Sequence, residues 1–131
     1  MDNSKPIGNA TTFVIIDDDD ITITLTRRLI KQFNKDFEVI NYKDARQAIK
    51  HFKDFGTSKN EIILLDINMP IFNGWDFLEE FEKSNLEGNI FMFSSSMDIT
   101  DLEKSKSFKA VIGYFSKPLN TQKIENILNA L

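Results

Sequence analysis

Short runs of apolar residues recur along the chain, separated by longer segments that mix polar and apolar positions. Four of these runs do not alternate with polar residues: 13–16, 62–65, 90–93 and 110–115. Unbroken runs of this length are typical of parallel strands covered on both faces, so each predicts a buried strand. A weaker run at residues 37–40 contains the charged Glu38 and predicts a strand at the edge of the sheet.

The segments between these runs carry apolar residues at helical spacing. The first segment has such residues at steps of four, which is the spacing of an apolar helix face: Ile21, Leu25, Leu29 and Phe33. Similar patterns cover residues 45–52, 77–81, 99–108 and 124–131. Asp98 and either Asn120 or Thr121 can cap the last two of these helices. Five strands alternating with helices through short connections predict an α/β fold with a doubly wound parallel sheet.

The composition is that of a folded protein without strong charge. The 131 residues suit one domain, 41% of them are hydrophobic, and twelve are Phe, which argues against disorder. The formal net charge of -4, with no basic cluster, argues against direct binding to nucleic acid or to an anionic membrane. The chain has no Cys, and no apolar run approaches the roughly 18 residues of a membrane span. We therefore expect a cytoplasmic protein.

Chemically active side chains follow the predicted strands. The first strand is followed by Asp17 and Asp18, the third by Asp66, the fourth by serines at 94–96 and the fifth by Lys117. In an open α/β sheet, ligands bind beyond the carboxyl ends of the strands, so these groups should meet at one edge. Clustered carboxylates raise one another's pKa unless a cation lies among them, and hard oxygen ligands suit Mg²⁺. The edge predicts a phosphoryl-transfer site with a carboxylate nucleophile.

Several separated motifs agree with this prediction and point to a family. The motifs IIDDDD, LLDINMPIFNG, FMFSSS and YFSKP, in this order and spacing, resemble the receiver domain of bacterial two-component response regulators. The resemblance covers about Thr12 to Leu131. It implies a flavodoxin-like fold, with a parallel sheet of order 2-1-3-4-5 flanked by five helices. It also divides the chain into a flexible N-terminal tail, residues 1–11, and a receiver domain, residues 12–131.

The resemblance implies a role for each acidic residue of the site. Asp66 would be the phospho-accepting aspartate and a ligand of Mg²⁺. Asp18 would bind the metal directly, Asp17 often through water, and Asn68 through its backbone carbonyl. Asp20 has a simpler explanation, because a negative charge favours the start of the first helix. Asp19 has no assigned role.

The same resemblance implies roles for residues that follow the last two strands. Ser94 would bond the phosphoryl group and act as a switch, although Ser96 would take this role if the strand ended later. Lys117 would be the catalytic lysine, and its bond to Pro118 is usually cis in similar proteins. Tyr114 would be the switch aromatic, although an aromatic residue in an apolar strand is equally explained by core packing.

The implied function is phosphorelay signalling, without turnover beyond self-phosphorylation and slow self-dephosphorylation. A sensor histidine kinase or a histidine phosphotransfer protein would phosphorylate Asp66. The phosphoryl group would then bias a surface of the fourth helix, fifth strand and fifth helix toward a downstream protein target, or be relayed onward. Because the chain ends with the fifth predicted helix, we expect a stand-alone receiver, similar to chemotaxis regulators, without an output domain.

Three alternatives are weaker. A haloacid-dehalogenase-like phosphatase would use Asp17 or Asp18 as nucleophile around Mg²⁺, but it needs a further acidic pair after the lysine motif and leaves LLDINMP unexplained. A flavodoxin-like cofactor binder conflicts with four carboxylates where a phosphate-binding loop should lie. His51 as a phosphohistidine lacks an all-helical or glycine-containing context, and a solvated helix face explains it better.

Overall fold

A single parallel sheet forms the centre of the protein. The computed structural model describes residues 11–131, and residues 1–10, most of the predicted tail, lie outside the described residues. The five strands are β1 (Thr12–Ile16), β2 (Glu38–Tyr42), β3 (Glu61–Leu65), β4 (Asn89–Ser94) and β5 (Val111–Ser116). Their order in the sheet is β2-β1-β3-β4-β5, and every pairing is parallel. The predicted fold class and strand order are confirmed.

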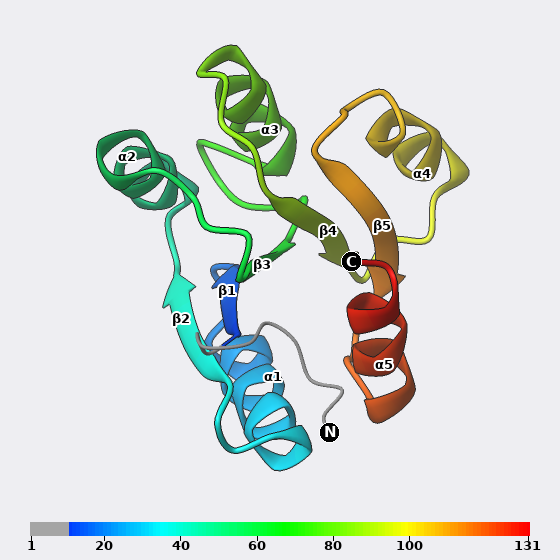
Figure 1. Cartoon of the computed structure of the whole chain (residues 1–131). Coiled ribbons are helices and arrows are strands. Elements are labelled where there is room, and N and C mark those ends of the chain that lie inside the picture. Colours follow the sequence, from blue (N-terminus) through cyan, green and yellow to red (C-terminus); the bar gives the residue numbers. More distant parts are fainter. Residues whose placement is uncertain (1–10) are drawn as a thin grey trace.

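Helices cover both faces of this sheet, as Figure 1 shows. They are α1 (Asp20–Phe33), α2 (Ala45–Phe55), α3 (Gly74–Lys83), α4 (Ile99–Ser105) and α5 (Thr121–Asn129). Helices α1 and α5 lie on one face, and α2, α3 and α4 lie on the other. Among the described residues, no helix is long and apolar enough to cross a membrane.

Each helix begins after a side chain that accepts a hydrogen bond from the first turn. These N-cap residues are Asp19, Asp44, Asn73, Asp98 and Asn120. The predicted caps at Asp98 and Asn120 are confirmed, and so is Asp20 as the first residue of α1. Asp19 serves as the N-cap of α1, because its carboxylate accepts a hydrogen bond from the Thr22 amide, a donor that the helix leaves free.

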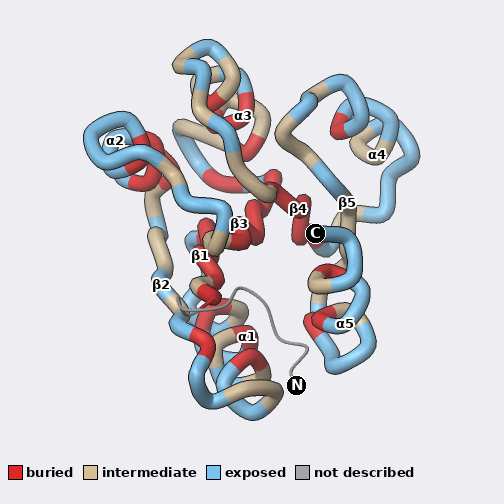
Figure 2. The backbone as a smooth tube through the Cα atoms, in the orientation of Figure 1, coloured by how far each residue is buried: buried red, intermediate tan, exposed pale blue. Residues whose placement is uncertain are grey.

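The core consists of one apolar layer on each side of the sheet. Figure 2 shows the buried residues gathered along the three inner strands β1, β3 and β4 and on the inward sides of the helices. One layer lies under α2 and α3 and includes Phe52, Phe77 and Phe81, while the other lies under α1 and α5 and includes Ile30 and Ile124. The inner strands are therefore rigid supports for the residues that follow them.

The fifth strand differs from its prediction. It was expected to be buried, but β5 is partly exposed along its length, and Ile112 is 41% exposed. Because β5 pairs only with β4, it forms the second edge of the sheet. The other edge, β2, was predicted correctly, although it extends two residues beyond the predicted end at residue 40.

The first helix packs on a different side from the one that its pattern indicated. Ile21 is 69% exposed and Leu25 is 53% exposed, whereas Ile23, Thr26 and Ile30 are buried. A step of four residues exceeds one helical turn by about 40°, so successive members of such a row drift around the helix. The row therefore follows the buried face only at its C-terminal end.

Thr11, the last residue of the predicted tail, is bound to the start of β2. Thr11 is buried, and its carbonyl accepts a hydrogen bond from the Glu38 amide at 2.9 Å. The division of the chain into tail and domain otherwise stays a prediction.

Candidate functional site

Two adjacent strands bring the predicted acidic residues together. Ile16 and Leu65, the last residues of β1 and β3, are paired in register, so Asp17 and Asp66 follow them side by side. The Asp66 amide continues the ladder by donating to the Ile16 carbonyl at 3.0 Å. One carboxylate oxygen each from Asp17, Asp18 and Asp66 lies within 4.8 Å of the others. The sheet thus assembles the cluster expected from the strand ends.

Burial makes this cluster electrostatically demanding. Asp17 is 1% exposed and Asp66 is 6% exposed, whereas Asp18 is open to solvent. Burial, and then the charge of Asp17, raise the pKa of Asp66 to about 6, although Lys117 acts in the opposite direction. The Asp66 carboxyl group is therefore protonated more readily than that of an ordinary aspartate.

Lys117 reaches this cluster from the loop after β5. Its Nζ lies 2.6 Å from Asp17 Oδ2 and 3.5 Å from Asp66 Oδ1, and its side chain is only 16% exposed. The Lys117 amide donates to the Ser94 carbonyl at 3.0 Å, which fixes the start of the loop against β4. The bond from Lys117 to Pro118 is cis, as expected.

The donor set fits a hard divalent cation. The cluster holds three carboxylates, and the single ammonium group of Lys117 pairs with two of them, which leaves an excess of negative charge. Asp17 Oδ2 is buried beside Lys117, but among the described residues it accepts no hydrogen bond of good geometry. Clustered carboxylate oxygens are hard ligands of the kind that Mg²⁺ prefers. Asn68 lies two residues after Asp66, and its role as a ligand stays a prediction.

The serines after β4 have separate environments. β4 ends at Ser94, which is fully buried, and Ser94 Oγ accepts a hydrogen bond from the Ser96 amide at 3.2 Å. Ser96 Oγ instead donates to Asp101 at 3.0 Å and accepts from the Asp98 amide, at the beginning of α4. The strand end therefore favours Ser94 over Ser96 as the group at the site.

Tyr114 is partly buried, as core packing predicts. Its ring packs against the core layer beneath α2 and α3, and its hydroxyl donates to the Ser96 carbonyl at 2.9 Å. The ring thus links β5 to the loop that follows β4. Its role as a switch, like the role of Ser94, stays a prediction.

Gly74 is a positioning residue that the sequence interpretation missed. A Cβ atom there would lie 2.9 Å from Ile67 Cα and closer still to the Asp66 carbonyl oxygen. The Gly74 amide also donates to the Ile67 carbonyl at 2.9 Å. Only glycine lets α3 approach the backbone of Asp66 this closely. The available signal was the Asn-Gly pair at the end of the LLDINMPIFNG motif.

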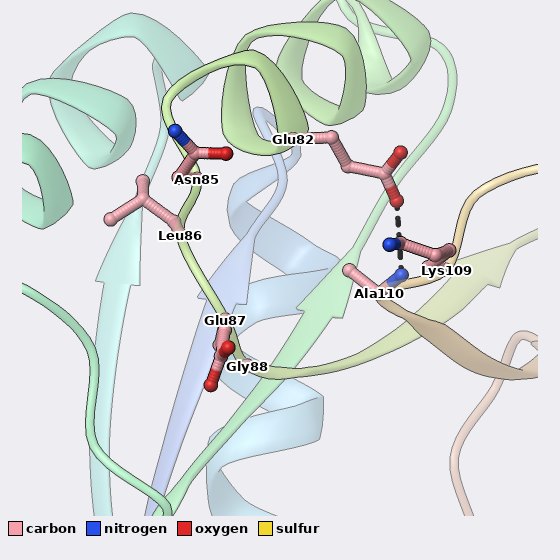
Figure 3. A pocket seen from close by; sticks show the side chains of 7 residues that line it. All are labelled: Glu82, Asn85, Leu86, Glu87, Gly88, Lys109 and Ala110. Atoms are coloured by element: carbon pink, nitrogen blue, oxygen red, sulfur yellow. Dashed lines mark hydrogen bonds between the residues drawn. The ribbon is translucent and has the colours of Figure 1, made fainter.

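A separate hollow lies at the end of the sheet opposite the acidic cluster, where β4 and β5 begin. Figure 3 shows it beside the residues that precede β4 and β5. Its volume is about 310 Å³. The Glu82 carboxylate on its wall accepts a hydrogen bond from the Ala110 amide at 3.0 Å, so this acid secures the start of β5. The hollow shares no lining residue with the acidic cluster.

Comparisons with known proteins agree with this geometry. A family model described as the response regulator receiver domain matches residues 13–129. A two-component response regulator from Cytophaga hutchinsonii is 29% identical, with a TM-score of 0.79 over 90% of this chain and 93% of that chain. A response regulator receiver protein from Dyadobacter fermentans is 28% identical, with a TM-score of 0.80 over 92% and 96%.

A curated relative is longer than this chain. The transcriptional regulatory protein DcuR of Escherichia coli is 27% identical over 115 residues, which are 88% of this chain and 47% of DcuR. The chain thus spans about half the length of this relative.

Proposed function

The chain belongs to the response regulator receiver domain family of two-component signalling proteins, and on this premise we propose that Asp66 is its phospho-acceptor. The observation that carries the proposal is the place of Asp66 at the end of the central strand β3, buried between Asp17 and Lys117. With a pKa of about 6, its carboxylate is mostly ionised at neutral pH and can act as a nucleophile.

The chemistry follows from the groups around Asp66. A carboxylate oxygen of Asp66 forms a bond to phosphorus while the bond between phosphorus and the donor's leaving atom breaks, and the bonding electrons leave with the donor. The Lys117 ammonium stabilises negative charge on the transferring group, and the Ser94 hydroxyl donates a hydrogen bond to it. Asp17, Asp18, Asp66 and the Asn68 carbonyl would hold Mg²⁺, which supplies further charge neutralisation.

Partners follow from the family. Receiver domains are phosphorylated by histidine kinases and interact with other proteins. We infer a sensor histidine kinase or a histidine phosphotransfer protein as the cytoplasmic donor for Asp66. We propose that the surface of α4, β5 and α5 binds a downstream protein, or that the phosphoryl group is relayed onward. Ser94 and Tyr114 would be the switch residues that couple Asp66 to this surface. Turnover would be limited to self-phosphorylation and slow self-dephosphorylation.

Labelling with a small donor tests the acceptor. Acetyl phosphate with Mg²⁺ should add a single phosphoryl group to the protein, as measured by intact mass. Asp66→Asn should abolish the addition, while Asp54→Asn, which changes an exposed aspartate on α2, should retain it. Normal labelling of Asp66→Asn would overturn the assignment. Repeated hydrolysis of phosphate monoesters would instead favour the phosphatase alternative with Asp17 or Asp18 as nucleophile.

A further inference from the structure

Lys123, in the first turn of α5, binds the loop that carries Lys117. Its Nζ donates to the Ser116 carbonyl at 2.7 Å, to the Pro118 carbonyl at 2.9 Å and to Ser116 Oγ at 3.1 Å. These acceptors belong to the two residues on either side of Lys117. An ammonium group has three N–H donors, so the whole donor capacity of Lys123 is directed at Ser116, the last residue of β5, and at Pro118 in the loop.

The position of Lys123 is not explained by helix formation. A positive charge near the N-terminus of a helix is opposed by the helix dipole. The start of α5 is already capped by Asn120, whose side chain accepts from the Lys123 amide at 2.7 Å. A cation at this point breaks a local rule, and such departures are expected where function compensates them. This misplaced charge was the sequence signal that could have identified Lys123.

The loop needs an anchor after Lys117. Before that point, the Lys117 amide donates to the Ser94 carbonyl and holds the chain against β4. The next residue is Pro118, which has no backbone N–H and cannot donate in the same way. Lys123 supplies an attachment after Lys117 by donating to the Pro118 carbonyl, and its bond to the Ser116 carbonyl ties this point to the end of β5. Charge-assisted hydrogen bonds of this kind are stronger than neutral ones.

We propose that Lys123 is a positioning residue for Lys117. By holding both neighbours of Lys117, it keeps the Lys117 ammonium beside Asp17 and Asp66. Lys123 contacts none of the acids in the described structure and acts only through the loop. This inference rests on the proposed phosphorylation of Asp66.

Phosphoryl transfer should depend on Lys123, whereas Mg²⁺ binding should not. Loss of the Lys123 ammonium should let the loop and the Lys117 side chain occupy other positions, which slows phosphoryl transfer. The carboxylates that would bind Mg²⁺ follow β1 and β3 and are held by the inner strands. Affinity for Mg²⁺ should therefore not fall in the same variant.

The experiment compares Lys123→Met, Lys123→Arg and Lys50→Met with the wild-type chain. Lys50 is an exposed lysine on α2 and serves as the matched control. In Lys123→Met, the maximal rate of Asp66 phosphorylation at saturating acetyl phosphate should fall about tenfold. Lys123→Arg should restore most of that rate, because it retains a charged donor, and Lys50→Met should match the wild type.

Two further readouts exclude a merely structural effect. Calorimetric titration should show undiminished Mg²⁺ affinity in Lys123→Met, and NMR of the Lys117 ammonium should show a shifted or broadened signal. An unchanged rate and an unchanged signal would overturn the proposal, as would an equal loss of Mg²⁺ affinity and transfer rate. Absence of labelling in the wild-type chain would refute the proposed function instead, while the NMR comparison would still test Lys123.

Discussion

The ammonium group of Lys117 lies 2.6 Å from the buried carboxylate of Asp17. This distance is shorter than the 3.5 Å that separates Lys117 from Asp66. The other oxygen of Asp17 accepts a hydrogen bond from the Asp19 amide at 2.9 Å. Lys117 therefore neutralises the charge of Asp17 more fully than that of Asp66. The pKa of Asp66 stays raised by burial and by the charge of Asp17.

Replacing Lys117 with Met should destabilise the metal-free protein. The change leaves Asp17 and Asp66 buried without their cation, and breaking a buried ion pair in this way costs about 3 kcal/mol. Urea unfolding at neutral pH with a chelator measures the loss. Lys106→Met removes an exposed pair with Glu103 and should change the free energy of unfolding by less than about 0.5 kcal/mol. Equal effects in the two variants would contradict the prediction.

Asp66→Asn should stabilise the metal-free protein at neutral pH. The pKa of Asp66 is about 6 in the folded protein and near 3.8 in the unfolded chain. Between these values the folded protein binds more protons, so wild-type stability decreases as pH rises through this window. The advantage of Asp66→Asn should therefore be greatest above pH 6, at roughly 2 to 3 kcal/mol, and should shrink on acidification toward pH 4.

Urea unfolding across this pH range measures that difference. Asp54→Asn is the control, because it changes an exposed carboxylate and should alter stability little at any pH. If Asp66→Asn were no more stable than the wild type at pH 7, the electrostatic cost assigned to Asp66 would be wrong.

Asp18→Ala should weaken Mg²⁺ binding without weakening the fold. Asp18 is exposed, so its removal loses little packing, but it takes one of three carboxylates from the cluster. We expect affinity for Mg²⁺ to fall by about tenfold or more in a calorimetric titration. Asp20→Ala is the matched control, because Asp20 pairs with Lys43 and lies outside the cluster. Unchanged affinity in Asp18→Ala would remove Asp18 from the ligands.

Two identical substitutions on α1 test which side of the helix packs on the sheet. Ile30 is fully buried, and Ile30→Ala should lower the free energy of unfolding by about 2 to 5 kcal/mol. Ile21 is 69% exposed, and Ile21→Ala should cost less than about 0.5 kcal/mol. Denaturant unfolding of both variants checks the contrast, and similar losses would contradict the packing of α1.

Much of the fold and half of the site follow from local patterns in the chain. Apolar runs located all five strands, and for the inner strands β1, β3 and β4 the reason is that a strand buried on both faces needs continuous apolar residues. The same runs placed Asp17 and Asp66 at strand ends, and parallel strands bring their carboxyl ends to one edge. Caps at Asp98 and Asn120 were also recognisable, since capping depends only on neighbours in sequence.

The remaining features depended on which distant segments came into contact. The partial exposure of β5 and of Ile21 reflects the packing of whole elements, which local spacing does not specify. The need for Gly74 arises where α3 meets the backbone after β3, and the anchoring by Lys123 arises where α5 meets the end of β5. The raised pKa of Asp66 likewise requires burial and the nearness of Asp17, a residue 49 positions away along the chain. Electrostatic and packing energies depend on distances in space, and only the folded chain sets those distances.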